Sequence, residues 1–246
     1  MPARILIFGG GSGVGLAAAR LLAARGDEVI VAGRNLEQIA PKRAAAAPPV
    51  RRELDGLEAH SVDGKDVAAI EELFATIGEI DHLVITAGAT NRGGSFVDDI
   101  TDASLRATFD GKFFVQVNVA QRGAKRIRRG GSITLFSGGA SRRALPGMAN
   151  VAAVNGALDA IVPTLARELA PTRVNSISPG TLRTSYWDGT PDAQLDQIFA
   201  RTAAGLPAGR VGTAEDIARA VAFVIDSSFM TGSTLCIDGG LPHSTL

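Results

Sequence analysis

Residues 8–15 read FGGGSGVG, a run of small residues whose spacing suits the binding of a phosphate group. Glycine permits a tight turn, lets the backbone approach a ligand closely, and lets the next helix pack near the preceding strand. A helix that begins directly after such a turn points its free N–H groups at an anion. An apolar run, RILIF, precedes the glycines and a helical pattern follows them. This context predicts that the turn holds the pyrophosphate of a dinucleotide.

The second apolar run ends in VIVAGRN, which places Arg34 and Asn35 where many dinucleotide-binding folds carry an acidic residue. An acidic side chain at that point binds the ribose hydroxyls of NAD. A guanidinium instead pairs with a 2′-phosphate through two hydrogen bonds and stacks on adenine. The chain is therefore predicted to bind NADP(H) in preference to NAD(H). The alternative is that Arg34 is an ordinary surface arginine at the end of a strand.

The elements that position these residues follow from the apolar pattern. Short runs that are apolar on both faces are typical of buried parallel strands. They cover residues 4–8, 28–32, 82–87, 132–136, 173–178 and 233–238. Helical spacing of apolar residues occurs over 15–25, 66–77 and 214–225. The alternation predicts an α/β fold, a Rossmann-type doubly wound parallel sheet of about seven strands flanked by helices on both faces. We find no repeat or boundary, so residues 1–246 are predicted to form a single domain.

Composition narrows the classes of function. The chain has 25 basic and 25 acidic residues, a balance that argues against nucleic acid as a partner. The first apolar run is too short for a signal peptide or a membrane span, so we expect a cytoplasmic protein without a membrane partner. The three histidines lack metal-ligand spacing with a carboxylate, so no metal site is expected.

The sequence resembles the short-chain dehydrogenase/reductase family over essentially its whole length. The glycine run is similar to the family's TGxxxGxG, with Phe8 in place of threonine, and ITAG at 85–88 stands where the family has NNAG. RVNSISPGTLRT at 173–184 is close to RVNxxxPGxxxT. The segments LPAGRVGTAEDIARAVAFVI and MTGSTLCIDGG also follow the family's C-terminal pattern.

The resemblance implies roles for several of these residues. Asp63 is expected to bond the adenine amino group, Pro179 and Gly180 to wall the nicotinamide, and Thr184 to bond its carboxamide. The small Ala87 leaves room for the adenosine ribose. The predicted cofactor-binding residues are Gly9, Gly11, Ser12, Gly13, Val14, Gly15, Arg34, Asn35, Asp63, Gly64, Ala87, Gly88, Pro179, Gly180, Leu182 and Thr184.

The catalytic positions of the resemblance carry other residue types. The family uses a tyrosine as proton donor, a lysine four residues later, a serine and a helical asparagine. Aligning NGAL at 155–158 with the end of the family's YxxxK motif places Val151 at the tyrosine and Asn155 at the lysine. Gly138, next to Ser137, then stands at the serine, and Lys112 at the asparagine.

Relative to the family, the lysine and the asparagine have thus exchanged places: the helix that carries the family's asparagine carries Lys112 here, and the helix that carries its lysine carries Asn155. We expect the Lys112 ammonium to point into the pocket and bond Asn155 directly or through one water, with Ser137 or backbone carbonyls as a further acceptor. Lys112, Ser137 and Asn155 are therefore the predicted catalytic residues.

Three functions remain open at this point. The first is an oxidoreductase that transfers hydride between NADP(H) and a small carbonyl or alcohol, with Lys112, Tyr186 or a water as proton donor. The second is a non-catalytic NADP(H)-binding sensor or partner subunit. The third is a lyase or isomerase that reuses the pocket. The resemblance also implies a homodimer or homotetramer built on the fourth and fifth helices.

Two pairs of residues near the expected substrate entrance have alternative interpretations. Arg142 and Arg143 follow the fifth strand and either attract an anionic substrate or are solvated loop charges. Tyr186 and Trp187, with the segment after them, either form a lid over the substrate or pack against the fold.

Overall fold

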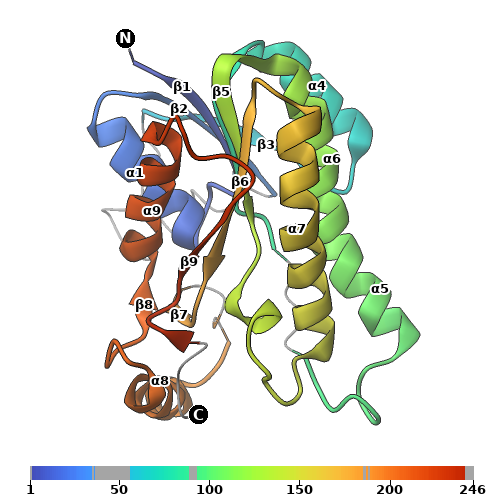
Figure 1. The fold of residues 1–246 in the computed structure, drawn as a ribbon, viewed down its shortest axis with the longest axis vertical. Coiled ribbons are helices and arrows are strands. Elements are labelled where there is room, and N and C mark those ends of the chain that lie inside the picture. Colours follow the sequence, from blue (N-terminus) through green and yellow to red (C-terminus); the bar gives the residue numbers. More distant parts are fainter. Residues whose placement is uncertain are drawn as a thin grey trace.

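A sheet of seven parallel strands forms the centre of the computed structural model, which describes residues 2–34, 36, 56–88, 93–184, 187 and 189–241. Its strand order is β3-β2-β1-β4-β5-β6-β9 (Figure 1). The strands are β1 (Arg4–Phe8), β2 (Glu28–Gly33), β3 (Glu58–Ser61), β4 (Ile80–Ile85), β5 (Ile127–Phe136), β6 (Arg173–Pro179) and β9 (Thr234–Ile237). A separate short pair joins β7 (Leu182–Arg183) to β8 (Gly212–Thr213). This order and the helices described below confirm the predicted doubly wound fold.

Helices cover both faces of the sheet. They are α1 (Gly13–Ala24), α4 (Val67–Ile77), α5 (Asp102–Gly111), α6 (Phe113–Gly123), α7 (Ala149–Glu168), α8 (Asp192–Gly205) and α9 (Ala214–Asp226), with single 3-10 turns η1 (Ala124–Arg126) and η2 (Gly139–Ser141). In Figure 1, α1 and α9 lie together on one face, and α4, α6 and α7 lie on the other.

Alternate residues of each central strand enter two different cores, which explains why these strands are apolar on both faces. In β1, Leu6 and Phe8 pack in the cluster formed with α4, α6 and α7. Ile5 and Ile7 pack in the cluster formed with α1 and α9. All four side chains are 2% exposed or less, so removing either helical layer would expose one half of each strand.

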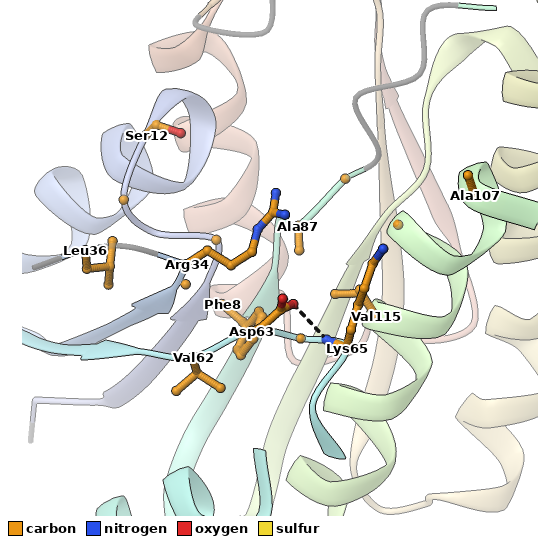
Figure 2. A pocket seen from close by; sticks show the side chains of 16 residues that line it. Phe8, Ser12, Arg34, Leu36, Val62, Asp63, Lys65, Ala87, Ala107 and Val115 are labelled. Carbon is orange, nitrogen blue, oxygen red and sulfur yellow. Dashed lines mark hydrogen bonds between the residues drawn. The ribbon is translucent and has the colours of Figure 1, made fainter. Parts of the chain in front are cut away.

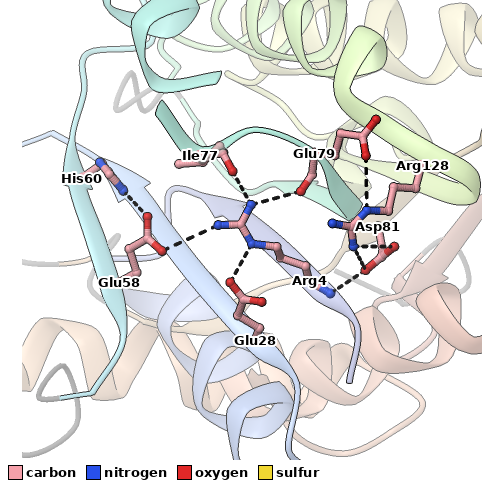
Figure 3. Close-up of polar contacts among 8 residues, drawn as sticks. All are labelled: Arg4, Glu28, Glu58, His60, Ile77, Glu79, Asp81 and Arg128. Atoms are coloured by element: carbon pink, nitrogen blue, oxygen red, sulfur yellow. Dashed lines mark hydrogen bonds and ion pairs between the residues drawn. The ribbon is translucent and has the colours of Figure 1, made fainter. Parts of the chain in front are cut away.

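The amino ends of the strands are tied together by charged groups (Figure 3). The Arg4 guanidinium donates to Glu28 at 2.6 Å and to the backbone oxygen of Ile77. The backbone N–H of Arg4 donates to Asp81 at 2.7 Å, and Arg128 pairs with the same carboxylate at 3.3 Å. These groups close the edge of the sheet opposite the carboxyl ends, where ligands bind in open α/β folds.

Several element boundaries differ from those predicted, and two of them bear on the site. β4 ends at Ile85, although the apolar run continues to Ala87, because the residues after Ile85 leave the strand ladder. The helix predicted to carry Lys112 is broken at that residue, which has φ −131° and ψ −62° and ends α5 and begins α6. Apolar periodicity does not report such a break, because both halves keep the same buried face.

Helix α7 is the one described helix that is long and apolar enough to cross a membrane by length and composition, with a mean hydropathy of 1.2. A helix in the core of a soluble protein passes the same test. In this fold α7 packs against β6 and η2, and its central residues Val154, Leu158 and Val162 are buried.

Candidate functional site

A pocket of about 600 Å³ lies at the carboxyl ends of the strands (Figure 2). Eight of the residues predicted to bind the cofactor line it: Gly9, Gly11, Ser12, Arg34, Asp63, Gly64, Ala87 and Gly88. They follow β1, β2, β3 and β4, so the parallel sheet brings together four segments that are far apart in the sequence. This is the edge at which open α/β sheets bind ligands.

The glycine turn brings α1 against the end of β1. Gly9 has φ +99°, a conformation that side chains rarely adopt. A Cβ atom on Gly15 would lie 2.2 Å from the backbone oxygen of Gly9, so a side chain at that point would push the helix away. Gly13 and Gly15 therefore act within the first turn of α1 rather than as walls of the pocket. Ser12 precedes that helix without a side-chain cap, which leaves its first N–H groups available to an anion.

Two basic side chains reach into the pocket. Figure 2 shows Arg34 and Lys65 on either side of Asp63. The backbone N–H of Lys65 donates to the Asp63 carboxylate at 3.0 Å, which holds that turn in shape. All three side chains are exposed, so their charges are available to a bound anion. Asn35, predicted to assist Arg34, lies outside the described residues.

The wall opposite the glycine turn was not predicted. Ala107 and Gly111 of α5 and Val115 of α6 complete the pocket, and Lys65 was also missed. These three residues recur every four positions, the spacing that a sequence pattern uses for one helical face, although in the structure they belong to two successive helices. Small residues at that spacing were the available signal in the sequence.

The segment after β6 forms a different part of the site. Pro179, Gly180, Leu182 and Thr184 do not line the main pocket. A Cβ atom on Gly180 would lie 2.7 Å from the backbone of Asp238, so the glycine permits close packing against the end of β9. Leu182 instead lines a second pocket of about 190 Å³ beside α9.

The Lys112 ammonium is held between α7 and the end of β5. Its Nζ donates to Oδ1 of Asn155 at 2.7 Å and to the backbone oxygen of Ser137 at 2.8 Å. Asn155 is 2% exposed, and Lys112 directly follows Gly111 of the pocket wall. The contact expected between the exchanged residue types is therefore present as a direct hydrogen bond, whereas Lys112, Ser137 and Asn155 are not among the residues that line the main pocket.

Burial lowers the pKa of Lys112 from 10.5 to about 8, because the charged form loses hydration. The carboxylate of Asp159, one turn after Asn155 on α7, opposes this shift by attracting the ammonium. Asp159 also accepts hydrogen bonds from Ser141 at 2.9 Å and Thr234 at 3.2 Å. Lys112 thus has a proton that it can release near neutral pH.

Comparison with known proteins gives the family. A family model described as enoyl-(acyl carrier protein) reductase matches residues 9–242. A curated relative, the short-chain dehydrogenase/reductase ATR9 of Stachybotrys chlorohalonatus, is 32% identical over 245 residues, covering 96% of this chain and 95% of the relative.

This chain belongs to the short-chain dehydrogenase/reductase family.

Other relatives span the chain to a similar extent. L-xylulose reductase of Mus musculus is 31% identical over 250 residues and covers 96% of this chain and 95% of its own. The crystal structure of a small-chain dehydrogenase in complex with NADPH is 34% identical with a TM-score of 0.82, covering 98% of this chain and 99% of that one. The chain is therefore similar to such proteins along its whole fold.

In this short-chain dehydrogenase/reductase, Ser137 contributes its backbone rather than its hydroxyl to Lys112. The hydroxyl is buried and has no hydrogen-bond partner among the described residues. A Cβ atom on the neighbouring Gly138 would lie 2.9 Å from Nδ2 of Asn155. The glycine therefore makes room for the amide that receives Lys112.

The residues near the expected substrate entrance of this short-chain dehydrogenase/reductase have structural partners. Arg142 lies 3.6 Å from the Asp159 carboxylate, and Arg143 donates to the backbone oxygen of Leu241. Trp187 stacks edge-on against Phe199 of α8 with ring centroids 5.5 Å apart. The ring contact favours the packing interpretation for Trp187, whereas the two interpretations of Arg142 and Arg143, attraction of an anionic substrate or solvated loop charges, stay predictions. Tyr186 lies outside the described residues.

No group of three or more His, Cys, Asp or Glu side chains is arranged to hold a metal ion in the part of the chain that the structure describes. Nδ1 of His82 and the hydroxyl of Ser132 form a hydrogen bond of 2.9 Å, and burial lowers the pKa of His82. His60 lies 2.7 Å from Glu58 at the start of β3. Both histidines belong to the sheet rather than to the pocket.

Proposed function

We propose that this chain is an NADP(H)-dependent oxidoreductase that acts on a small carbonyl or alcohol and uses Lys112 in place of the family's tyrosine. The observation that carries the proposal is the ammonium of Lys112, bonded to Asn155 at 2.7 Å beside the wall of a dinucleotide-sized pocket. The similarity to a dehydrogenase solved with NADPH supports the choice of cofactor.

The residues of the pocket fit the parts of NADP(H). The N-terminus of α1 suits the pyrophosphate, and Arg34 suits the 2′-phosphate. No side chain of Ser12 caps that helix, so its first N–H groups are available to a ligand. The bound cofactor supplies the hydride. The protein must then supply one proton to the substrate oxygen.

The family's usual proton donor has no counterpart at the aligned position. Val151 stands there, half-buried on α7, and valine has no proton to give. Gly138 stands at the aligned serine and has no hydroxyl to orient a substrate. Lys112 is the group beside the pocket whose pKa, about 8, lies close to the working pH of a cytoplasmic enzyme.

The contacts of Lys112 suit a general acid. Two of its three N–H hydrogens have acceptors, on Ser137 and Asn155. The third has no acceptor among the described residues and can donate to the oxygen of a carbonyl substrate as negative charge develops there. After the transfer, the neutral amine still donates to both acceptors. The site therefore does not need to rearrange when the proton moves.

The test is NADPH oxidation, followed by absorbance, with a panel of ketones and aldehydes, together with NADPH binding by fluorescence titration. Turnover with at least one substrate supports the proposal. Binding without turnover across the panel would favour the alternative, a non-catalytic sensor or partner subunit. A protein that does not bind NADPH would contradict both functions.

Restoring the tyrosine alone is not expected to restore the family's mechanism. In Val151→Tyr the new hydroxyl has no lysine at position 155 to lower its pKa, and Gly138 offers it no serine. We expect turnover within about threefold of the unmodified protein, small against the 10²- to 10⁴-fold that an effective general acid contributes. A hundredfold gain from this single change would contradict the alignment. Val151→Phe, which adds a similar ring without a hydroxyl, is the matched control.

We also propose that the chain is a single domain that self-associates through the face carrying α5, α6 and α7. Leu105 and Phe114 lie on these helices with exposures of 37% and 49%. Large apolar side chains on neighbouring helices are typical of a protein interface. We expect light scattering to give a mass at least twice the 25.4 kDa of one chain. A monomer at micromolar concentration would contradict this.

A further inference from the structure

Gln116 is a fully buried polar side chain that the proposed chemistry does not use. It lies on α6 one turn after Lys112, and its relative exposure is 0%. Its Nε2 donates to the backbone oxygens of Phe136 at 2.8 Å and Ala87 at 3.2 Å. Its Oε1 accepts from the backbone N–H of Phe136 at 2.8 Å. The amide is thus engaged on both sides, which a buried amide requires.

This amide occupies the point where β4 and β5 separate. The last registered pair between these strands is Val84 with Thr134. Two residues further along, Phe136 has lost its partner on that side, and Gln116 supplies both the donor and the acceptor that a strand would have given it. The same side chain reaches Ala87 beyond the end of β4. The Gln116 side chain therefore makes the two hydrogen bonds to Phe136 that the backbone of a neighbouring strand would otherwise make.

Both ends of this bridge touch the proposed site. Phe136 directly precedes Ser137, whose backbone oxygen accepts from Lys112. Ala87 lines the pocket. The backbone N–H of Gln116 donates to the backbone oxygen of Lys112 at 3.0 Å, which links the residue that begins α6 to the amide one turn later. Lys112, just before α6, thus supplies the ammonium, and the first turn of α6 holds the strand end that receives it.

We infer that Gln116 is a positioning residue. It fixes the backbone at the end of β5, where Ser137 accepts a hydrogen bond from the Lys112 ammonium, and it joins this backbone to Ala87 in the wall of the nucleotide pocket. The role assigned to Lys112 rests on the proposed function, but the positioning can be measured without turnover. If Gln116 had a purely structural role, its substitution would change the stability of the protein and leave the pKa of Lys112 unchanged. If Gln116 positions the site, its substitution changes the pKa of Lys112.

The experiment uses the full chain with carbon-13-labelled lysine. The sequence contains four lysines, so each side-chain signal can be followed by NMR, and Lys112→Met assigns the one of interest. In the unmodified protein we expect the Lys112 signal to titrate near pH 8. In Gln116→Met the end of β5 is freed and the ammonium gains water. Its midpoint should then rise toward 10.5 by about one pH unit or more.

NADPH affinity supplies a second measurement. Because Ala87 loses its hydrogen bond in Gln116→Met, the wall should shift and the dissociation constant should rise by roughly tenfold, the effect of about one lost interaction. Thr134→Val is the matched control, since this buried hydroxyl on β5 has no hydrogen-bond partner among the described residues. We expect that control to leave both the Lys112 midpoint and NADPH affinity unchanged.

A second variant covers the case in which Gln116→Met does not fold. Gln116→Asn keeps the amide but is one methylene shorter, so it cannot reach Ala87 and Phe136 together. It should move the Lys112 midpoint in the same direction. A midpoint that stays within about 0.3 units of the unmodified protein in a folded variant would overturn the inference, whatever the enzyme assay shows. Absence of turnover with a shifted midpoint would instead count against the proposed function alone.

Discussion

Lys112→Met is expected to lower NADPH-dependent turnover by roughly 10²- to 10⁴-fold, the usual contribution of a general acid. The thioether has a similar length and no proton to donate. It also leaves the oxygens of Ser137 and Asn155 without the donors that they now have at 2.8 and 2.7 Å. Steady-state rates with the best substrate of the panel measure the effect.

The pH dependence gives this prediction a direction. Carbonyl reduction needs the protonated ammonium, so its rate should fall as pH rises through about 8, whereas alcohol oxidation needs the neutral amine and should rise there. Lys125→Met, the same change at an exposed lysine, is the control and should leave both profiles unchanged. A Lys112→Met protein that retains turnover within about threefold would assign the proton donor to another group.

The same group links pH to stability. The pKa of Lys112 is lower in the folded chain, about 8, than its ordinary value of 10.5. Between these values the unfolded chain binds the extra proton, so the free energy of unfolding should rise with pH by up to about 1.4 kcal/mol per unit. Urea unfolding at pH 7.5 and 9.5 should show this rise in the unmodified protein and not in Lys112→Met.

Arg34→Asp is expected to invert the preference between the two nicotinamide cofactors. In the unmodified protein, a paired guanidinium and 2′-phosphate contribute about 1.5–3 kcal/mol, which is roughly a ten- to hundredfold tighter binding of NADPH than of NADH. An aspartate at this position repels the 2′-phosphate and accepts hydrogen bonds from ribose hydroxyls. Fluorescence titration with both cofactors measures the two dissociation constants.

Lys65 limits how far Arg34→Asp can change the ratio of the two dissociation constants. It reaches into the same pocket from the opposite side of Asp63 (Figure 2), so part of the attraction for phosphate remains in Arg34→Asp. Arg129→Asp is the matched control, since it makes the same charge change at an exposed residue of β5 outside the pocket. Equal affinities for NADPH and NADH in the unmodified protein would show that Arg34 does not select the cofactor.

The local pattern of the sequence determined the sheet and the phosphate turn. Strands such as β1 are apolar on both faces because each face packs against helices, so their pattern alone indicates a covered parallel sheet. Gly15 is required by a contact within one strand–turn–helix unit, since a Cβ atom there would meet the backbone oxygen of Gly9, and the turn itself gives Gly9 its positive φ. Features that depend on interactions over a few residues can be predicted from the sequence. The position of Arg34 at the end of β2 was predicted in the same way.

The tertiary structure decided what depends on contacts between distant segments. Lys112 and Asn155 lie 43 residues apart, and the resemblance predicted their meeting, but the pKa of the ammonium depends on how much water the fold removes around it. The bridge made by Gln116 had no signal in the sequence, because it fills a gap that exists only where β4 and β5 separate. The break of the helix lies at Lys112, the residue whose ammonium bonds Asn155 of α7 and the backbone of Ser137 after β5. Desolvation and strand divergence are properties of the assembled fold, so no local pattern of residues records them.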